Sequence, residues 1–223
     1  MKKILIITPP FYRLQGASLV HYPPGCCYVA AVLEKSGFHP VIYNADYDKN
    51  KKTILGNTDH INVSALTKQH GEYLKRLNSG TDPVWEEIRD YIKKFNPDIL
   101  IISVFNTTLT AGNRIAKMAK VLNPKVLTVF EGCTNRGLHC AVDPSVVGDF
   151  SVMDFALRRE PEQTVVDLVK VINKDTADFS KIKGLSWKNS RGKVVHNPDR
   201  TSVFFVAAIP AWVIGRESVR RKI

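Results

Sequence analysis

Hydroxyl, amide and glycine residues gather in three segments, 8–22, 103–110 and 131–137, that each follow a run of apolar residues. Hydroxyl and amide groups before a helix can bind the amides, phosphates and ribose of a ligand, and glycine lets a flat ligand approach the backbone closely. We therefore expect one binding site. Its candidate residues are Thr8, Pro9, Gln15, Gly16, Ser18 and His21 in the first segment, Ser103, Asn106, Thr107 and Thr108 in the second, and Glu131, Gly132 and Cys133 in the third.

Some of these residue types have an ordinary structural interpretation as well. The hydroxyls of 103–110 can cap the following helix whether or not a ligand binds. His21 could approach a bound metal or simply contact solvent. Cys133, His139 and Cys140 match no common zinc spacing, which favours incidental loop residues.

Common catalytic motifs are absent from the sequence. Asp46 stands where dinucleotide-binding sheets place a ribose-binding acid, but no G-x-G-x-x-G follows the first apolar run, which argues against a nicotinamide site. The motifs G-x-S-x-G, H-E-x-x-H and G-x-x-x-x-G-K are missing too. Cys26 and Cys27 begin a predicted helix, where buried packing is the usual role of free thiols. We assign no catalytic residue.

Apolar runs alternate with amphipathic segments along most of the chain. This alternation predicts a flavodoxin-like, Rossmann-type α/β fold with a doubly wound, five-stranded parallel sheet. Ligands of such sheets bind beyond the carboxyl ends of the strands, where the three candidate segments would meet. The predicted strands are 3–8, 40–45, 99–104, 126–130 and 155–157, and the predicted helices are 24–36, 83–95, 110–122 and 162–172.

The remaining segments suggest an insertion and a tail. Residues 47–80 are polar, with a short helix around Tyr73 to Leu77. Residues 184–187 and 193–196 flank the turn sequence N-S-R-G and predict a β-hairpin. We expect a first unit at 1–175 and a hairpin with a linker at 176–223.

The composition indicates the expected cellular location of the protein and the character of its basic surface. No stretch approaches the roughly 20 apolar residues of a membrane span, and four cysteines form no disulfide framework, so we expect a cytoplasmic protein. The net charge of +11 is dispersed, and the short basic runs 49–52 and 220–222 contain no aromatic residue. We therefore favour a solvated or partner-facing basic surface over a nucleic-acid interface.

Five stretches occur in an order that is typical of one family. Residues 23–37 are similar to a P-P-L-G-L helix ending in A-x-L-x-x-x-G, residues 96–103 to P-D-x-V-G-I-S, and residues 154–162 to D-F-V-V-R-G-E-G-E. Residues 182–200 resemble the hairpin and N-P-x-R that follow, and residues 209–212 the linker beyond. Together they resemble the cobalamin-binding domain that precedes the catalytic core of radical S-adenosylmethionine enzymes.

The resemblance implies a corrin lying over the strand ends, with its nucleotide tail between the 103–108 segment and Gly132. The corrin's cobalt would carry a methyl group or tune a radical reaction in a neighbouring catalytic domain or subunit of a methyltransferase-like enzyme. S-adenosylmethionine and a four-iron four-sulfur cluster belong to that part, because C-x-x-x-C-x-x-C is missing here. The D-x-H-x-x-G motif that ligates cobalt through histidine is also missing, so no protein ligand to the metal is assigned.

Departures from the family pattern leave other interpretations open. Glu131 stands where the family has the first of two glycines, and Arg159 and Pro161 replace two more. A degenerate interaction module without the cofactor is the alternative, and a basic nucleic-acid binder with strongly salt-dependent affinity is the third. An exposed edge would also be compatible with a homodimer. We expect no catalytic activity from this chain alone.

Overall fold

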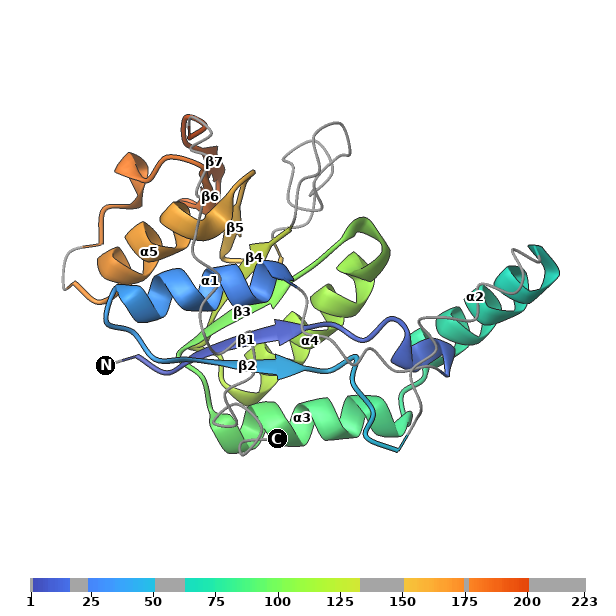
Figure 1. The fold of residues 1–223 in the computed structure, drawn as a ribbon. Helices are drawn as coiled ribbons and strands as arrows, with labels where there is room; N and C mark the ends of the chain where they lie inside the picture. Colours follow the sequence, from blue (N-terminus) through green and yellow to red (C-terminus); the bar gives the residue numbers. More distant parts are fainter. Residues whose placement is uncertain (1, 17–23, 51–62, 133–150, 175–176, 201–223) are drawn as a thin grey trace.

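The computed structural model describes residues 2–16, 24–50, 63–132, 151–174 and 177–200. These residues form one sheet with helices on both faces (Figure 1). The sheet order is β2-β1-β3-β4-β5-β6-β7. The α/β prediction is confirmed, but the sheet has seven strands rather than the five predicted.

The first five strands are parallel and the last two antiparallel. Strands β2-β1-β3-β4-β5 have the order of flavodoxin-like sheets. In this order, β2 is added on one side of β1, and β3 and the later strands are added on the other side. The parallel strands are β1 (Ile4–Thr8), β2 (Pro40–Asn44), β3 (Ile99–Ser103), β4 (Leu127–Glu131) and β5 (Phe155–Leu157).

Helices cover both faces of the sheet, which explains why β1 and β3 are apolar throughout. Helices α1 (Pro24–Lys35) and α5 (Pro161–Ile172) cover one face, and α3 (Pro83–Phe95) and α4 (Leu109–Leu122) the other (Figure 1). Alternate side chains serve the two cores: Ile4 and Ile6 pack toward α1, and Leu5 and Ile7 toward α3 and α4.

The ends of α3 follow the signals in the sequence. The Asp82 carboxylate accepts a hydrogen bond of 3.0 Å from the Val84 amide, and Pro83 occupies the first turn, where no N–H is needed. Asn96 closes the helix with a left-handed φ of 48°, and Pro97 follows. The predicted start and end of this helix are confirmed.

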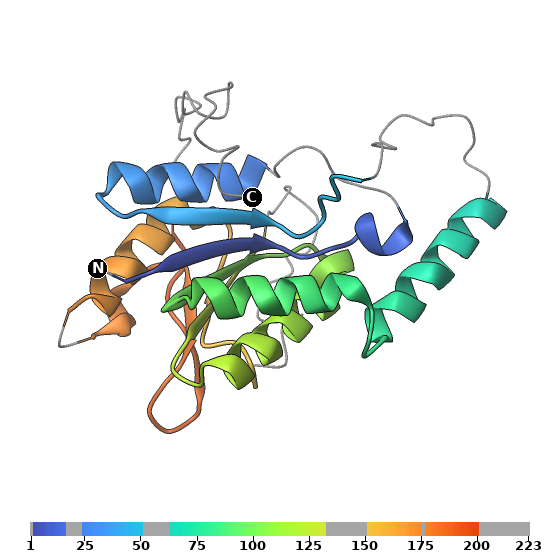
Figure 2. The same ribbon diagram turned by 90° about the horizontal axis from the view of Figure 1, so that it is seen from below.

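Helix α2 (Val63–Asn78) is longer than the short helix predicted around Tyr73. It projects from the body of the molecule (Figures 1 and 2) and is attached near its C-terminal end. Tyr73 donates to the Thr107 carbonyl at 2.9 Å, and Arg76 donates to the Arg13 carbonyl at 2.7 Å. Among its described side chains, at residues 67–78, only Tyr73 and Leu77 are buried, so apolar periodicity did not predict its length.

The predicted hairpin is present as β6 (Leu185–Lys188) and β7 (Val194–His196). Its turn contains Gly192 with φ of 74°, and the Asn189 side chain accepts from the Arg191 amide at 3.0 Å. Strand β6 pairs with β5 in antiparallel register, so the hairpin extends the main sheet. This pairing accounts for the two additional strands.

Gly112 lies where α4 packs closest to the sheet. A Cβ built on Gly112 would come within 2.6 Å of Val104 Cγ1 and 3.3 Å of Ile102 Cγ2, and both neighbours are stiff, β-branched residues. The Gly112→Ala variant is expected to lose about 1–2 kcal/mol of unfolding free energy, because overpacking outweighs the helix-propensity gain of about 1 kcal/mol. Urea denaturation measures the loss.

Gly71 in α2 provides the matched control. A Cβ on Gly71 meets nothing within 4 Å. The Gly71→Ala variant should therefore gain about 0.5–1 kcal/mol from helix propensity alone. Effects of the same sign in both variants would contradict the close approach of α4 to the sheet.

Candidate functional site

The carboxyl ends of three adjacent strands bring together three of the predicted site residues. Thr8 ends β1, Ser103 ends β3 and Glu131 ends β4. Ser103 and Glu131 are register partners. All three are buried, with exposed fractions of 6%, 6% and 2%. This edge contains the reversal of chain order between β1 and β3, where open α/β sheets bind ligands.

A fourth buried residue, Cys26 in the first turn of α1, links these strand ends. The Cys26 thiol lies 3.2 Å from the Thr8 hydroxyl and also interacts with the Ser103 side chain. The Ser103 side chain in turn interacts with the Glu131 carboxyl. We call Thr8, Cys26, Ser103 and Glu131 the crevice cluster. Its side chains are buried at the strand ends, next to the first turn of α1.

Glu131 is the unusual member of the crevice cluster. Its Oε1 atom is inaccessible to solvent and has no hydrogen-bond partner among the described residues. That oxygen faces the first turn of α1, where a Cβ built on Gly25 would lie 4.0 Å away. Burial raises the pKa of Glu131 to about 7, opposed by the Ser103 hydrogen bond and assisted by the charge of Glu162. The carboxyl is therefore protonated in mildly acidic solution.

The two thiols of α1 have a structural role, as the sequence suggested. Cys26 is fully buried and Cys27 is nearly so. Burial raises the pKa of Cys26 to about 12, and the charge of Glu131 adds to this rise while Ser103 and Thr8 oppose it. A thiol that stays protonated at neutral pH is a poor nucleophile. Cys26 nevertheless contributes to the crevice cluster, which the sequence did not indicate.

An exposed rim lies beside the crevice cluster, after β3. The Phe105 side chain is 49% exposed, and Asn106 and Thr107 are exposed too, in the short helix η2 (Asn106–Thr108). Phe105 is not among the residues predicted from the sequence, although an aromatic residue near the end of a buried strand is a usable signal. Thr108 is buried and accepts a 2.8 Å hydrogen bond from the Phe105 amide, so its hydroxyl acts as a cap.

The segment after β1 is anchored by Asp46. Its Oδ1 accepts hydrogen bonds of 2.7 Å from the amides of Phe11 and Arg13. Burial raises the pKa of Asp46, and these amides oppose the rise. The Arg13 guanidinium also donates to Glu87 at 3.2 Å. The acid that could have marked a ribose site therefore holds a loop in place.

The other predicted site residues differ in their placement. Pro9 is buried, Gln15 is partly buried in η1 (Arg13–Gln15), and Gly16 is exposed with φ of 89°. Gly132 is buried directly after β4. Ser18, His21, Cys133, His139 and Cys140 lie outside the described residues.

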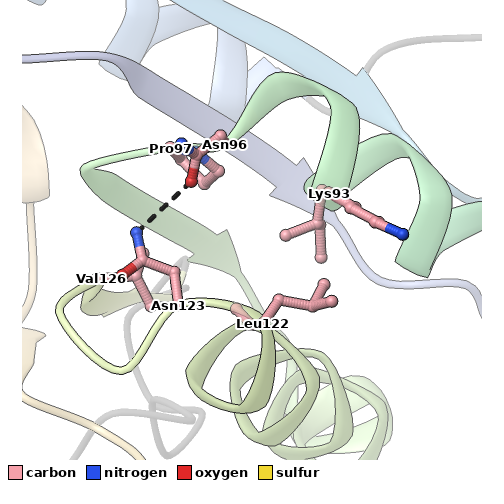
Figure 3. Close-up of a pocket in the computed structure, with 8 residues that line it drawn as sticks. Lys93, Asn96, Pro97, Leu122, Asn123 and Val126 are labelled. Atoms are coloured by element: carbon pink, nitrogen blue, oxygen red, sulfur yellow. Dashed lines mark hydrogen bonds between the residues drawn. The ribbon is translucent and has the colours of Figure 1, made fainter.

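A small pocket lies at the opposite edge of the sheet, between the C-terminal ends of α3 and α4 (Figure 3). Its volume is about 50 Å³, enough for a few water molecules and far below a cofactor site. The Asn123 amide donates to Asn96 Oδ1 across it at 3.4 Å. Within the described ranges, no group of three His, Cys, Asp or Glu residues could hold a metal ion. None of the described helices is long and apolar enough to cross a membrane.

No protein-family model matches this chain, but it resembles several proteins in sequence. It is 24% identical over 200 residues to the anaerobic magnesium-protoporphyrin IX monomethyl ester cyclase of Rubrivivax gelatinosus, covering 88% of this chain and 29% of that protein. It is 24% identical over 202 residues to the cytidylyl-2-hydroxyethylphosphonate methyltransferase of Streptomyces wedmorensis, covering 89% and 33%. An uncharacterised methyltransferase of Pyrococcus horikoshii is 32% identical over 130 residues, covering 58% and 27%. The chain thus spans about a third or less of each relative.

Solved structures of a much longer protein share the fold. The cobalamin-dependent S-adenosylmethionine radical enzyme OxsB, with aqua-cobalamin and S-adenosylmethionine bound, matches with a TM-score of 0.55 over 91% of this chain and 23% of OxsB. The same enzyme with aqua-cobalamin alone gives a TM-score of 0.56 over the same shares. The identity is 13% in both comparisons, so the likeness concerns the fold.

Proposed function

We propose that this chain is the cobalamin-binding cofactor domain of a radical S-adenosylmethionine, methyltransferase-like enzyme. The observation that carries the proposal is the polar and aromatic rim at the carboxyl edge of a sheet whose fold matches part of a cobalamin-dependent radical enzyme. The length of the relatives supports a further, catalytic part that acts with this chain. In this proposal residues 1–175 carry the cofactor, and 176–223 lead toward the catalytic part.

The residues of the rim fit a corrin ring. A corrin is a flat macrocycle bordered by amide side chains. Phe105 offers an exposed apolar face, and the exposed Asn106 and Thr107 offer amide and hydroxyl groups that can pair with amides. When bound, the corrin supplies the cobalt chemistry. The chain's own residues would bind and orient the ring.

Titration of the purified protein with hydroxocobalamin, followed by gel filtration and visible spectroscopy, tests this proposal. We expect one corrin per chain to co-elute with the protein and to show a shifted spectrum. Gly132→Trp, directly after β4, should weaken binding at least about tenfold by placing a bulky ring against the site.

Gly80→Trp is the matched control, because a Cβ on Gly80 meets nothing within 4 Å. Gly80 is exposed and lies between α2 and α3, outside the three segments of the proposed site, so this variant should bind like the wild type. Circular dichroism of both variants checks that they fold. A wild-type protein that retains no corrin would refute the proposal.

One observation favours a second candidate, a non-cofactor interaction module of the same fold. Glu131 places a buried carboxyl in the crevice of a ligand-binding edge, where an inserted ligand group would need space. If no corrin is retained, this candidate takes first place. Pull-down with the separately expressed catalytic part would then be the next test.

A further inference from the structure

We infer that Glu131 closes the crevice at the reversal of chain order, so that a bound corrin lies on the rim and its nucleotide tail stays outside the sheet. This inference rests on the proposed function, because it concerns the part of the same ligand that the site accepts. By this inference, Glu131 determines whether the site distinguishes a complete corrinoid from a corrinoid that lacks the nucleotide tail.

The Glu131 side chain lies between the strand ends and α1. It projects from the end of β4 toward two elements, contacting the Ser103 side chain on β3 and facing the first turn of α1 at Gly25. Its exposed fraction is 2%, and Ser103 is 6% exposed. The carboxyl thus bridges the space between the strand ends and α1.

The rest of the crevice cluster closes the same space from the β1 side. Cys26, with no exposed surface, lies between Thr8 and Ser103 and interacts with both side chains. An aromatic base entering here would have to separate these contacts and move a buried carboxyl. Because protein interiors are close-packed, making room for an aromatic base here would cost free energy.

The rim, in contrast, is open. Phe105 is 49% exposed, and Asn106 and Thr107 next to it are exposed. A flat ring can rest on these residues without disturbing the crevice cluster. Recognition of the ring and recognition of its appended tail are therefore separable in this site.

The experiment compares hydroxocobalamin with aquocobinamide, which has the ring but lacks the nucleotide. Dissociation constants are measured for the wild type, for Glu131→Gln, which keeps the side-chain volume, and for Glu131→Gly, which removes it. We expect the wild type and Glu131→Gln to bind both corrinoids within about threefold, and Glu131→Gly to prefer hydroxocobalamin by about tenfold or more. A wild-type preference for hydroxocobalamin of about tenfold would overturn the inference.

A second titration separates the inference from the proposed function. The free benzimidazole nucleoside of cobalamin is added to each protein and followed by ligand-observed NMR. If the nucleoside binds to Glu131→Gly but not to the wild type or Glu131→Gln, the closed crevice is supported. This holds even if no variant retains a corrin ring, because loss of ring binding refutes only the proposed function. If Glu131→Gly neither binds the nucleoside nor prefers hydroxocobalamin, the inference is overturned.

Discussion

Replacing Arg158 by methionine is expected to lower the free energy of unfolding by about 2–4 kcal/mol, because several hydrogen bonds from one buried charged group are lost together. Arg158 is 7% exposed and joins three parts of the chain. Its guanidinium donates to the Leu185 carbonyl at 2.9 Å, to the Ser186 hydroxyl at 2.6 Å, to the Asn197 carbonyl, and to Asp199 at 3.1 Å. Methionine fills part of the volume but cannot donate a hydrogen bond, so the Asn197 carbonyl loses its charged donor. The other three acceptors keep further partners: the Asn197 amide for Leu185, His196 for Ser186 and Arg159 for Asp199.

Arg159 is the matched control, because it also binds Asp199, at 3.0 Å, from an exposed position. Its side chain is 60% exposed, and an ion pair of this kind contributes little. Arg159→Met should change the unfolding free energy by no more than about 0.5 kcal/mol. Urea denaturation followed by tryptophan fluorescence and circular dichroism measures both variants. A loss below about 1 kcal/mol for Arg158→Met would show that its hydrogen bonds are not needed to hold the hairpin.

Glu131→Gln is expected to make the protein more stable than the wild type above neutral pH and to leave it nearly unchanged near pH 5. Burial raises the pKa of Glu131 from 4.5 to about 7. The native state therefore holds a proton that the unfolded chain releases between these values. The corresponding stabilisation is complete below the unfolded pKa and is lost as the pH rises through about 7, a change of about 3 kcal/mol. Glutamine does not ionise, so the variant avoids this loss.

Urea denaturation between about pH 5 and pH 8 tests the prediction, because the two stability curves should diverge as the pH rises. Glu162, whose pKa is also raised by burial, is present in both proteins and therefore titrates in both. Glu72→Gln on the exposed face of α2 is the control and should follow the wild-type curve. Parallel curves for wild type and Glu131→Gln would show that the carboxyl is not desolvated as described.

The parallel core could be predicted because its signals are local. β3 is apolar from Ile99 to Ile102 and ends at Ser103, and Asp82 with Pro83 starts a helix through short-range hydrogen bonding. The pairing of β6 with β5 could not be predicted from local patterns. It depends on long-range contacts such as those of Arg158 with the residues that follow β7.

The same distinction applies to the site. Thr8, Ser103 and Glu131 were predicted to lie together because parallel strands end at one edge, and the structure places them so. The inclusion of Cys26 depends on how α1 packs, and the direction of the Glu131 side chain depends on the space beneath α1. Neither can be derived from the spacing of residues along the chain.

The hairpin that extends the sheet also affects how this protein can associate. Without it, β5 would present an unpaired backbone edge, but β6 covers that edge. In the part of the chain that the structure describes, the outer strands are β7, which is three residues long, and β2, which begins with Pro40. A short strand and a proline both discourage the addition of a further strand. We therefore expect a second copy or a catalytic partner to dock against side chains rather than by continuing the sheet.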